Sequence, residues 1–296
     1  MKAFALAGLF SLAVLPFATH AQTAQPWMHS DVKSAWSQGY KGQGTTITVI
    51  DDYTSKSMLT GNFGTGTKTQ RHGDFTLLEA SMVAPSAKMR AIDFGNTGAV
   101  GLNKGGLNVL NASYGMNAAN GYANSQIGWS AREASMISYA KTGAAVVVKA
   151  AGNDGVAVTA ANAAGNADYL NRALVGAQSA IFVGALSRNG SNFVLSQASM
   201  ASYSNVAGTD KAVQNNFVVV GVDSSQTRLQ GTSFAAPIVS GYAAVLGSKF
   251  TQASATQITN QLLNTARTDT IANYNAATHG RGEASLSRAL APVAIR

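Results

Sequence analysis

Residues 231–241 read GTSFAAPIVSG, and this stretch decides how the rest of the chain is organised. The apolar run after Ser233 predicts a buried helix, which places the serine at a helix N-terminus. The first N–H groups of a helix have no intrahelical partner, and the helix dipole is positive there. Pro237 lacks an N–H and cannot bond the Ser233 carbonyl. Either the first turn is bent, or that carbonyl serves another purpose, or Thr232-Ser233 is an ordinary helix cap.

The composition indicates a globular protein. The chain has 296 residues, of which 46% are hydrophobic and 11% charged, with 30 glycines and no cysteine. These values favour a loop-rich folded body over a disordered chain, and they exclude a disulfide framework. The net charge is +8, but the basic residues are scattered without a run of three. We therefore interpret the charge as aiding solubility and expect no nucleic-acid partner.

The first 21 residues have the pattern of a signal peptide. Lys2 precedes an apolar run over residues 3–17, and Thr19-His20-Ala21 follows as a small-residue cleavage site. About 15 apolar residues are too few to span a bilayer, and no later run reaches that length. We expect cleavage after Ala21 and a mature chain that is soluble, secreted or periplasmic, without a membrane anchor. No repeat or linker divides residues 22–296, which predicts a single domain.

Hydrophobic periodicity predicts alternating strands and helices. The glycine- and threonine-rich residues 54–71 are expected to form a surface loop. Such alternation is typical of a mostly parallel sheet covered on both faces, a three-layer, doubly wound α/β fold. The expected strands are 45–50, 88–94, 107–112, 146–150, 181–186 and 217–222. The expected helices are 31–38, 72–84, 125–141, 255–267 and the one that follows Ser233 in the stretch 231–241.

Polar residues stand at the ends of these elements. Asp51 follows the first strand, at the edge where open α/β sheets place their sites. Outside the leader the chain has three histidines, and of these only His72 begins a helix between strands, unlike His29 and His279. A serine such as Ser233 needs a base to take its proton. His72 can be that base, and Asp51 can hold its tautomer.

Four sequence blocks resemble the subtilisin-like serine proteases, the subtilase family. They occur in the family's Asp, His, Asn, Ser order, and their match is strongest at the serine block. They also resemble passenger domains of Gram-negative autotransporters, but no translocator segment follows Arg296, so we expect a free protease. The blocks are ITVID (47–51), HG with VAPSA (72–73 and 83–87), AAGN (150–153) and GTSFAAPIVSG (231–241).

The resemblance implies a subtilisin-like fold and a role for each matching residue. Ser233 is implied as the nucleophile, His72 as general base and then acid, and Asp51 as the orienting carboxylate. The Asn153 side-chain amide and the Ser233 N–H are implied as the donors to the oxyanion.

The resemblance also implies where a substrate binds. Ser113, Tyr114 and Gly115 match the segment that pairs with an extended peptide. Ala151 and Gly152 are implied to border the pocket for the residue before the cut.

Several positions depart from the family pattern. Asp52-Tyr53 replaces the usual small residue and glycine, but Asp52 would point to the other face of a continuing strand, which favours Asp51. The family's His-Gly-Thr-His block ends here in Asp74-Phe75, so its second, non-triad histidine is absent. Lys149 lies in a strand that is usually apolar, and we interpret it as a side chain that snorkels to solvent.

Two short spacings in the sequence bear on calcium binding and on the need for a propeptide. Only 21 positions separate Asp51 from His72, so loops that hold calcium in some relatives are trimmed. No metal or other cofactor is therefore expected. About 30 residues lie between Ala21 and Asp51, which leaves no room for a folding-assisting propeptide. We expect folding without one, or with outside help.

Together these observations predict an exported, monomeric serine endopeptidase acting on peptide or protein substrates. One alternative is a catalytically silent protein of the same fold that binds peptides without cutting them. Another is an esterase or peptide ligase that uses the same triad, because nucleophiles other than water can react with an acyl-enzyme.

Overall fold

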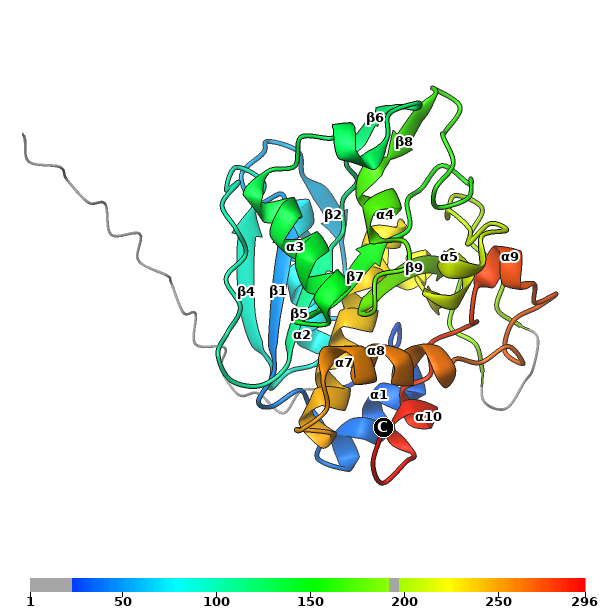
Figure 1. The fold of residues 1–296 in the computed structure, drawn as a ribbon. Helices are drawn as coiled ribbons and strands as arrows, with labels where there is room; N and C mark the ends of the chain where they lie inside the picture. The colour runs from blue at the N-terminus through cyan, green and yellow to red at the C-terminus, as the bar shows by residue number, and fades with distance from the viewer. Residues whose placement is uncertain (1–22, 192–196, 296) are drawn as a thin grey trace, which may run out of the picture.

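A parallel sheet of six strands forms the centre of the molecule (Figure 1). The computed structural model describes residues 23–191 and 197–295, so the predicted signal peptide lies outside the described residues. The strand order is β10-β9-β7-β5-β1-β4, and every neighbouring pair is parallel. The strands are β1 Thr46–Asp51, β4 Lys88–Asp93, β5 Asn108–Ala112, β7 Val146–Ala150, β9 Ala180–Leu186 and β10 Phe217–Gly221.

Helices cover both faces of the sheet. Alternate strand residues face opposite layers, so Val49 joins one hydrophobic core and Ile50 the other. This arrangement confirms the predicted three-layer α/β fold. The first face carries α1 Ser30–Ser37, α2 His72–Val83, α7 Ala236–Lys249, α8 Ala255–Asn264 and α10 Leu286–Leu290, and the second carries α3 Ala131–Thr142, α4 Tyr169–Leu174 and α5 Lys211–Asn215.

The predicted buried helix, here called the central helix, is α7, and it is enclosed along almost its entire length. All residues from Ala236 to Ser248 are buried. The helix packs closely on α2, because a Cβ at Gly241 would lie 2.5 Å from Val83 Cγ1. Its start is irregular: a 3-10 turn, η2 Thr232–Phe234, precedes it, and Pro237 lies in its first turn.

One predicted element was wrong, and another was predicted too long. Residues 54–71 contain a hairpin, β2 Leu59–Gly61 and β3 Lys68–Gln70, rather than a loop, and the Thr60 and Thr69 hydroxyls meet across it at 2.9 Å. The helix expected over 125–141 begins only at Ala131, after extended backbone at Ser130.

The buried face of α3 includes charged side chains. Ala131 and Ala134 are exposed, whereas the adjacent Arg132 and Glu133 are buried as an ion pair with Nη2 2.5 Å from Oε1. An apolar pattern could not reveal this face, because charged side chains form part of it.

The first helix is bonded to the end of the fold. Asp31 Oδ2 accepts hydrogen bonds from the Ser285 hydroxyl at 3.1 Å and from the Ser287 N–H at 2.9 Å. These bonds hold α1 against α10. Across residues 23–191 and 197–295, no helix combines the length and apolarity needed to cross a membrane.

Candidate active site

The predicted catalytic residues lie near the carboxyl ends of the central strands. From β1 the chain passes outward to β4, whereas from β5 it passes to β7 on the other side. The crevice between β1 and β5 is therefore the switch point at which such sheets bind ligands. Asp51 ends β1, Ser113 follows β5, Asn153 follows β7, and Ser233 lies in η2.

Asp51 and His72 are directly bonded. His72 Nδ1 lies 2.6 Å from Asp51 Oδ1, and the carboxylate is fully buried. Asp51 also accepts from the Asp52 N–H at 2.7 Å and from the Thr76 hydroxyl at 2.9 Å. With Nδ1 directed at the carboxylate, the other ring nitrogen is left to receive a proton. The His72 side chain is 28% exposed, which suits such an exchange.

Gly73 lets the helix start approach the end of β1. Its N–H donates to the Asp52 carbonyl at 2.9 Å, and a Cβ there would lie 2.7 Å from that oxygen. The Asp52 carboxylate is turned away into its own loop, where it accepts from the Ser55 hydroxyl and from the N–H groups of Thr54 and Ser55. The hydrogen bond from Ser55 is the main cause that lowers the pKa of Asp52.

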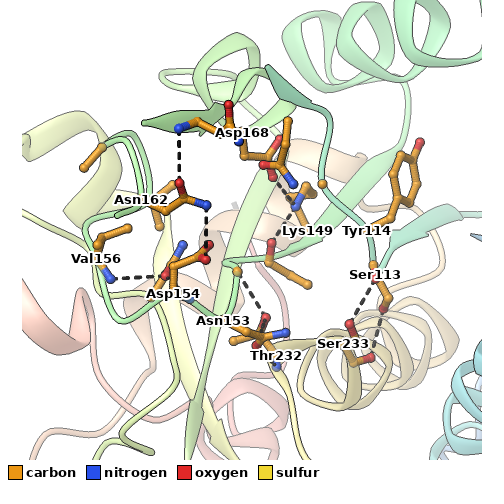
Figure 2. Close-up of a pocket in the computed structure, with 18 residues that line it drawn as sticks. Ser113, Tyr114, Lys149, Asn153, Asp154, Val156, Asn162, Asp168, Thr232 and Ser233 are labelled. Atoms are coloured by element: carbon orange, nitrogen blue, oxygen red, sulfur yellow. Dashed lines mark hydrogen bonds and ion pairs between the residues drawn. The ribbon is translucent and has the colours of Figure 1, made fainter. Parts of the chain in front are cut away.

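Ser233 faces Ser113 across the crevice (Figure 2). The Ser233 hydroxyl donates to the Ser113 carbonyl at 3.0 Å, and the Ser113 hydroxyl donates to the Ser233 carbonyl at 2.9 Å. The second bond uses the carbonyl that Pro237 leaves without a helical donor, and the first turn is a 3-10 turn. The first turn is therefore irregular, and the Ser233 carbonyl has a partner outside the helix, which are the first two of the three possibilities that the proline left open.

A line of buried hydrogen bonds supports Ser113. The Ser240 hydroxyl donates to Asn111 Oδ1 at 3.0 Å, and Asn111 Nδ2 donates to the Ser113 hydroxyl at 2.9 Å. All three side chains are buried. The line joins α7 to β5 and fixes which way the Ser113 hydroxyl points.

Thr232 orients the side chain of Asn153. Asn153 Oδ1 accepts from the Thr232 N–H at 2.8 Å and from its hydroxyl at 3.1 Å, while the Gly152 N–H donates to the same hydroxyl at 3.0 Å. Asn153 Nδ2 has no partner within residues 23–191 and 197–295. Its two N–H groups are therefore available to an oxygen in the crevice.

A cavity of about 250 Å³ opens beside Ser233. Of the residues predicted to bind substrate, Ser113, Tyr114, Gly115 and Gly152 line it, whereas Ala151 does not. Ala151 is buried in the second core, and its carbonyl accepts from Asn171 and Asn205. The remaining lining residues are Asn117, Lys149, Ala150, Asn153, Asp154, Val156, Val158, Ala160, Asn162, Asn166, Asp168, Asn205, Thr232 and Ser233.

Lys149 does not snorkel, so that prediction was wrong. Its side chain is 1% exposed, and Nζ lies 3.0 Å from Asp168 Oδ2 and 2.6 Å from the Ala150 carbonyl oxygen. A carboxylate from another part of the chain pairs with the ammonium inside the protein, so it has no need to reach solvent.

The Tyr114 side chain turns toward α3. Its hydroxyl donates to Glu133 Oε1 at 2.9 Å, and its ring stacks edge-on against Phe94. Burial and the nearby carboxylate raise the pKa of Tyr114. Burial opposes ionisation of Glu133, but hydrogen bonds from Ser130, Arg132 and Tyr114 outweigh it and lower the pKa of that carboxyl. Tyr114 therefore contributes mainly its backbone to the crevice.

Three supporting residues were missed in the sequence. Thr76 stands four positions after His72, a spacing that puts both on one helix face and could have indicated it. Thr232 was considered only as a helix cap. Asp168 carried no local signal. Within the described ranges, no cluster of three or more histidine or acidic side chains is arranged to hold a metal ion.

A family model and several solved structures match the chain. The family model described as the subtilase family matches residues 58–285. No curated protein sequence matches the chain.

Several solved structures are similar. A protease of Pseudoalteromonas arctica is 18% identical, with 92% of this chain and 99% of that one covered and a TM-score of 0.55. The MycP3 protease of a type VII (ESX-3) secretion system is 20% identical, with 88% and 86% covered and a TM-score of 0.53. A cold-adapted subtilisin-like serine proteinase is 16% identical, with 83% and 88% covered and a TM-score of 0.50. At these identities the likeness shows a shared fold.

Proposed function

The chain belongs to the subtilase family of serine proteases, and on that premise we propose that it is an exported endopeptidase using Asp51, His72 and Ser233. One observation carries the proposal: a partly exposed histidine is bonded at 2.6 Å to a buried carboxylate, at the sheet's switch point. Such a pair is the base that a serine hydroxyl requires.

The proposed reaction begins with a rotation of the Ser233 hydroxyl from the Ser113 carbonyl toward His72. His72 takes the proton as the oxygen attacks the peptide carbonyl, and Asp51 stabilises the resulting imidazolium. Asn153 Nδ2 and the Ser233 N–H donate to the oxyanion. His72 then protonates the leaving amine, and a water molecule hydrolyses the acyl-enzyme by the same route.

The segment after β5 supports peptide binding. The backbone N–H and C=O groups of Tyr114 and Gly115 bond to no other described residue. A peptide could therefore pair with them as an added strand and place one side chain in the cavity beside Ser233. This arrangement favours cleavage within a chain, because neither end of the peptide is needed for binding.

Export is the second part of the proposal. Lys2, the apolar run over residues 3–17 and the small residues before position 22 have the composition of a cleaved leader. N-terminal sequencing of the protein secreted or released from the periplasm is expected to begin at Gln22. A first residue of Met1 would contradict export by this leader.

The decisive test of the nucleophile is labelling with a fluorophosphonate. The wild-type protein is expected to be labelled, and Ser233→Ala to lose all label. Ser248→Ala is the matched control, since it removes another buried hydroxyl of the same helix, one bonded only to the Val245 carbonyl. No labelling of folded wild-type protein would refute the proposal.

Two alternatives are separated by further measurements. The bond from the Ser233 hydroxyl to the Ser113 carbonyl is the observation that favours a silent peptide-binding protein. That protein would bind peptides yet resist labelling. An esterase would hydrolyse an ester but not the matched peptide, so both substrates are assayed together.

A further inference from the structure

We propose that the Lys149–Asp168 ion pair makes the cavity beside Ser233 select a side chain ending in an uncharged hydrogen-bond acceptor, above all glutamine. This selectivity rests on the proposed function, because the cavity chooses a cleavage position only if Ser233 cuts beside it. The two charged residues lie together at the cavity (Figure 2).

The Lys149 ammonium retains one donor for a ligand. An ammonium group carries three N–H donors and no acceptor. Two of them are used, on Asp168 Oδ2 at 3.0 Å and on the Ala150 carbonyl at 2.6 Å. Among the described residues no partner takes the third, although Lys149 lines the cavity.

Asp168, in contrast, is occupied on both oxygens. Its Oδ1 accepts from the Met116 and Leu170 N–H groups, each at 3.0 Å, while its Oδ2 accepts from Lys149. The carboxylate caps α4 through Oδ1, and the Lys149 ammonium on Oδ2 partly neutralises it. Lys149 therefore supplies the unused hydrogen-bond donor of the pair.

Ionised ligands match the cavity poorly. One ammonium, that of Lys149, and two carboxylates, those of Asp154 and Asp168, line the cavity. A third carboxylate would add to a negative excess, and a basic side chain, which has no acceptor, would leave the third N–H of Lys149 unbonded. An apolar side chain would exclude water and leave the third N–H unbonded.

A carboxamide satisfies these conditions. Its oxygen accepts from Lys149, and it adds no charge. Gly115 also lines the cavity and leaves space beside the ion pair, since a Cβ there would lie 3.0 Å from Asp168 Oδ2. Glutamine is favoured over asparagine because its longer side chain brings the carboxamide nearer the ion pair.

The test compares kcat/KM for peptides that differ only in the residue before the cut. That residue is glutamine, glutamate, lysine, phenylalanine or methionine. Methionine serves as an apolar analogue that is close to glutamine in size. Glutamine is expected to exceed methionine by about tenfold or more, because the apolar chain leaves a buried donor unpaired. Lys149→Met is expected to reduce that ratio to within about twofold. Lys33→Met, at an exposed position on α1, is the control and should keep the wild-type ratio.

A second variant guards against misfolding. Lys149→Met combined with Asp168→Asn removes both charges and keeps a side-chain oxygen to cap α4. It should also lose the preference for glutamine.

Fluorophosphonate labelling of Ser233, which needs no peptide side chain, separates the two proposals. Labelled protein that cuts after methionine or phenylalanine as fast as after glutamine would overturn the selectivity and leave the peptidase intact. Neither labelling nor cleavage of any peptide would refute both.

Discussion

Ser113 and Ser233 are bonded to each other's carbonyl oxygens, although 120 positions separate them. The contact exists because Pro237 withholds the helical donor that would otherwise occupy the Ser233 carbonyl. The end of β5 and the start of the central helix are thereby held together at the crevice.

Ser113→Ala is expected to lower kcat by about tenfold or more, because a small misplacement of a reacting group is costly. It removes the donor to the Ser233 carbonyl and the acceptor of Asn111, so the unfolding free energy should also fall by about 1–3 kcal/mol. Steady-state kinetics and urea denaturation measure the two effects. Ser248→Ala should leave kcat unchanged, and equal kcat in both variants would argue against a positioning role for Ser113.

Asp51→Asn is expected to reduce kcat by about 10⁴-fold, because an amide cannot hold the His72 tautomer as the carboxylate does. Asp52→Asn should remain within a few-fold of wild type, since that carboxylate bonds only within its own loop. Kinetics on one peptide compare the pair. A larger loss from Asp52→Asn would reverse the assignment of the two acids.

Asn153→Leu is expected to lower kcat by about 10²–10³-fold with little change in KM, because its amide acts on charge that develops during reaction. Thr232→Val should cause a smaller loss. It removes one of the two donors that orient Asn153 and leaves the backbone donor at 2.8 Å. A rise in KM with unchanged kcat would instead make Asn153 a substrate-binding residue.

Glu79 provides a pH-dependent test of stability. It is buried on α2, its Oε2 has no hydrogen-bond partner among the described residues, and burial raises its pKa well above the ordinary 4.5. As pH rises, the unfolded chain therefore releases this proton at a lower pH than the folded protein does. The free energy of unfolding then falls by up to about 1.4 kcal/mol per pH unit above 4.5. Glu79→Met should be more stable than wild type at pH 8, and the advantage should vanish below pH 4.5.

Glu133→Gln is expected to change stability at high pH in the opposite direction to Glu79→Met. Because hydrogen bonds lower the pKa of Glu133 despite burial, its carboxylate stabilises the fold above pH 4.5, and that contribution is lost as pH falls through the lower, folded pKa. The variant should therefore be less stable than wild type at pH 8. Urea midpoints at several pH values test both residues, and parallel pH profiles for Glu79→Met and wild type would contradict the linkage.

Sequence patterns predicted the parts of this molecule that depend on local chemistry. The first strand was expected over residues 45–50 and runs from Thr46 to Asp51, because β-branched runs bounded by glycine favour buried strands. The sequence Ser254-x-x-Gln257 has the pattern of a capping box, and the two residues are bonded reciprocally at the start of α8. Both features are contained within a few neighbouring residues.

Features that depend on distant residues were not predictable in this way. Periodicity could not show that Lys149 pairs with Asp168, since the partner belongs to β8 Asn166–Asp168, which is brought to the site by pairing with β6 Asn117–Ala119. The proline showed that the Ser233 carbonyl lacked a helical donor, but not which residue supplies one. The local sequence can show that a backbone group lacks its usual hydrogen-bond partner. Only the folded structure shows which distant residue takes that place.

The hydrogen bonds that Asp31 accepts from Ser285 and Ser287 have a consequence for the order in which the chain assembles. Their partners lie 254 and 256 positions apart in the chain. During synthesis from the amino end, residues 30–37 emerge long before the segment that holds them exists. Contacts of such long sequence separation also form late, because closing the loop loses chain entropy before the new contacts contribute any stabilisation. The first helix to be made is thus among the last to reach its final place.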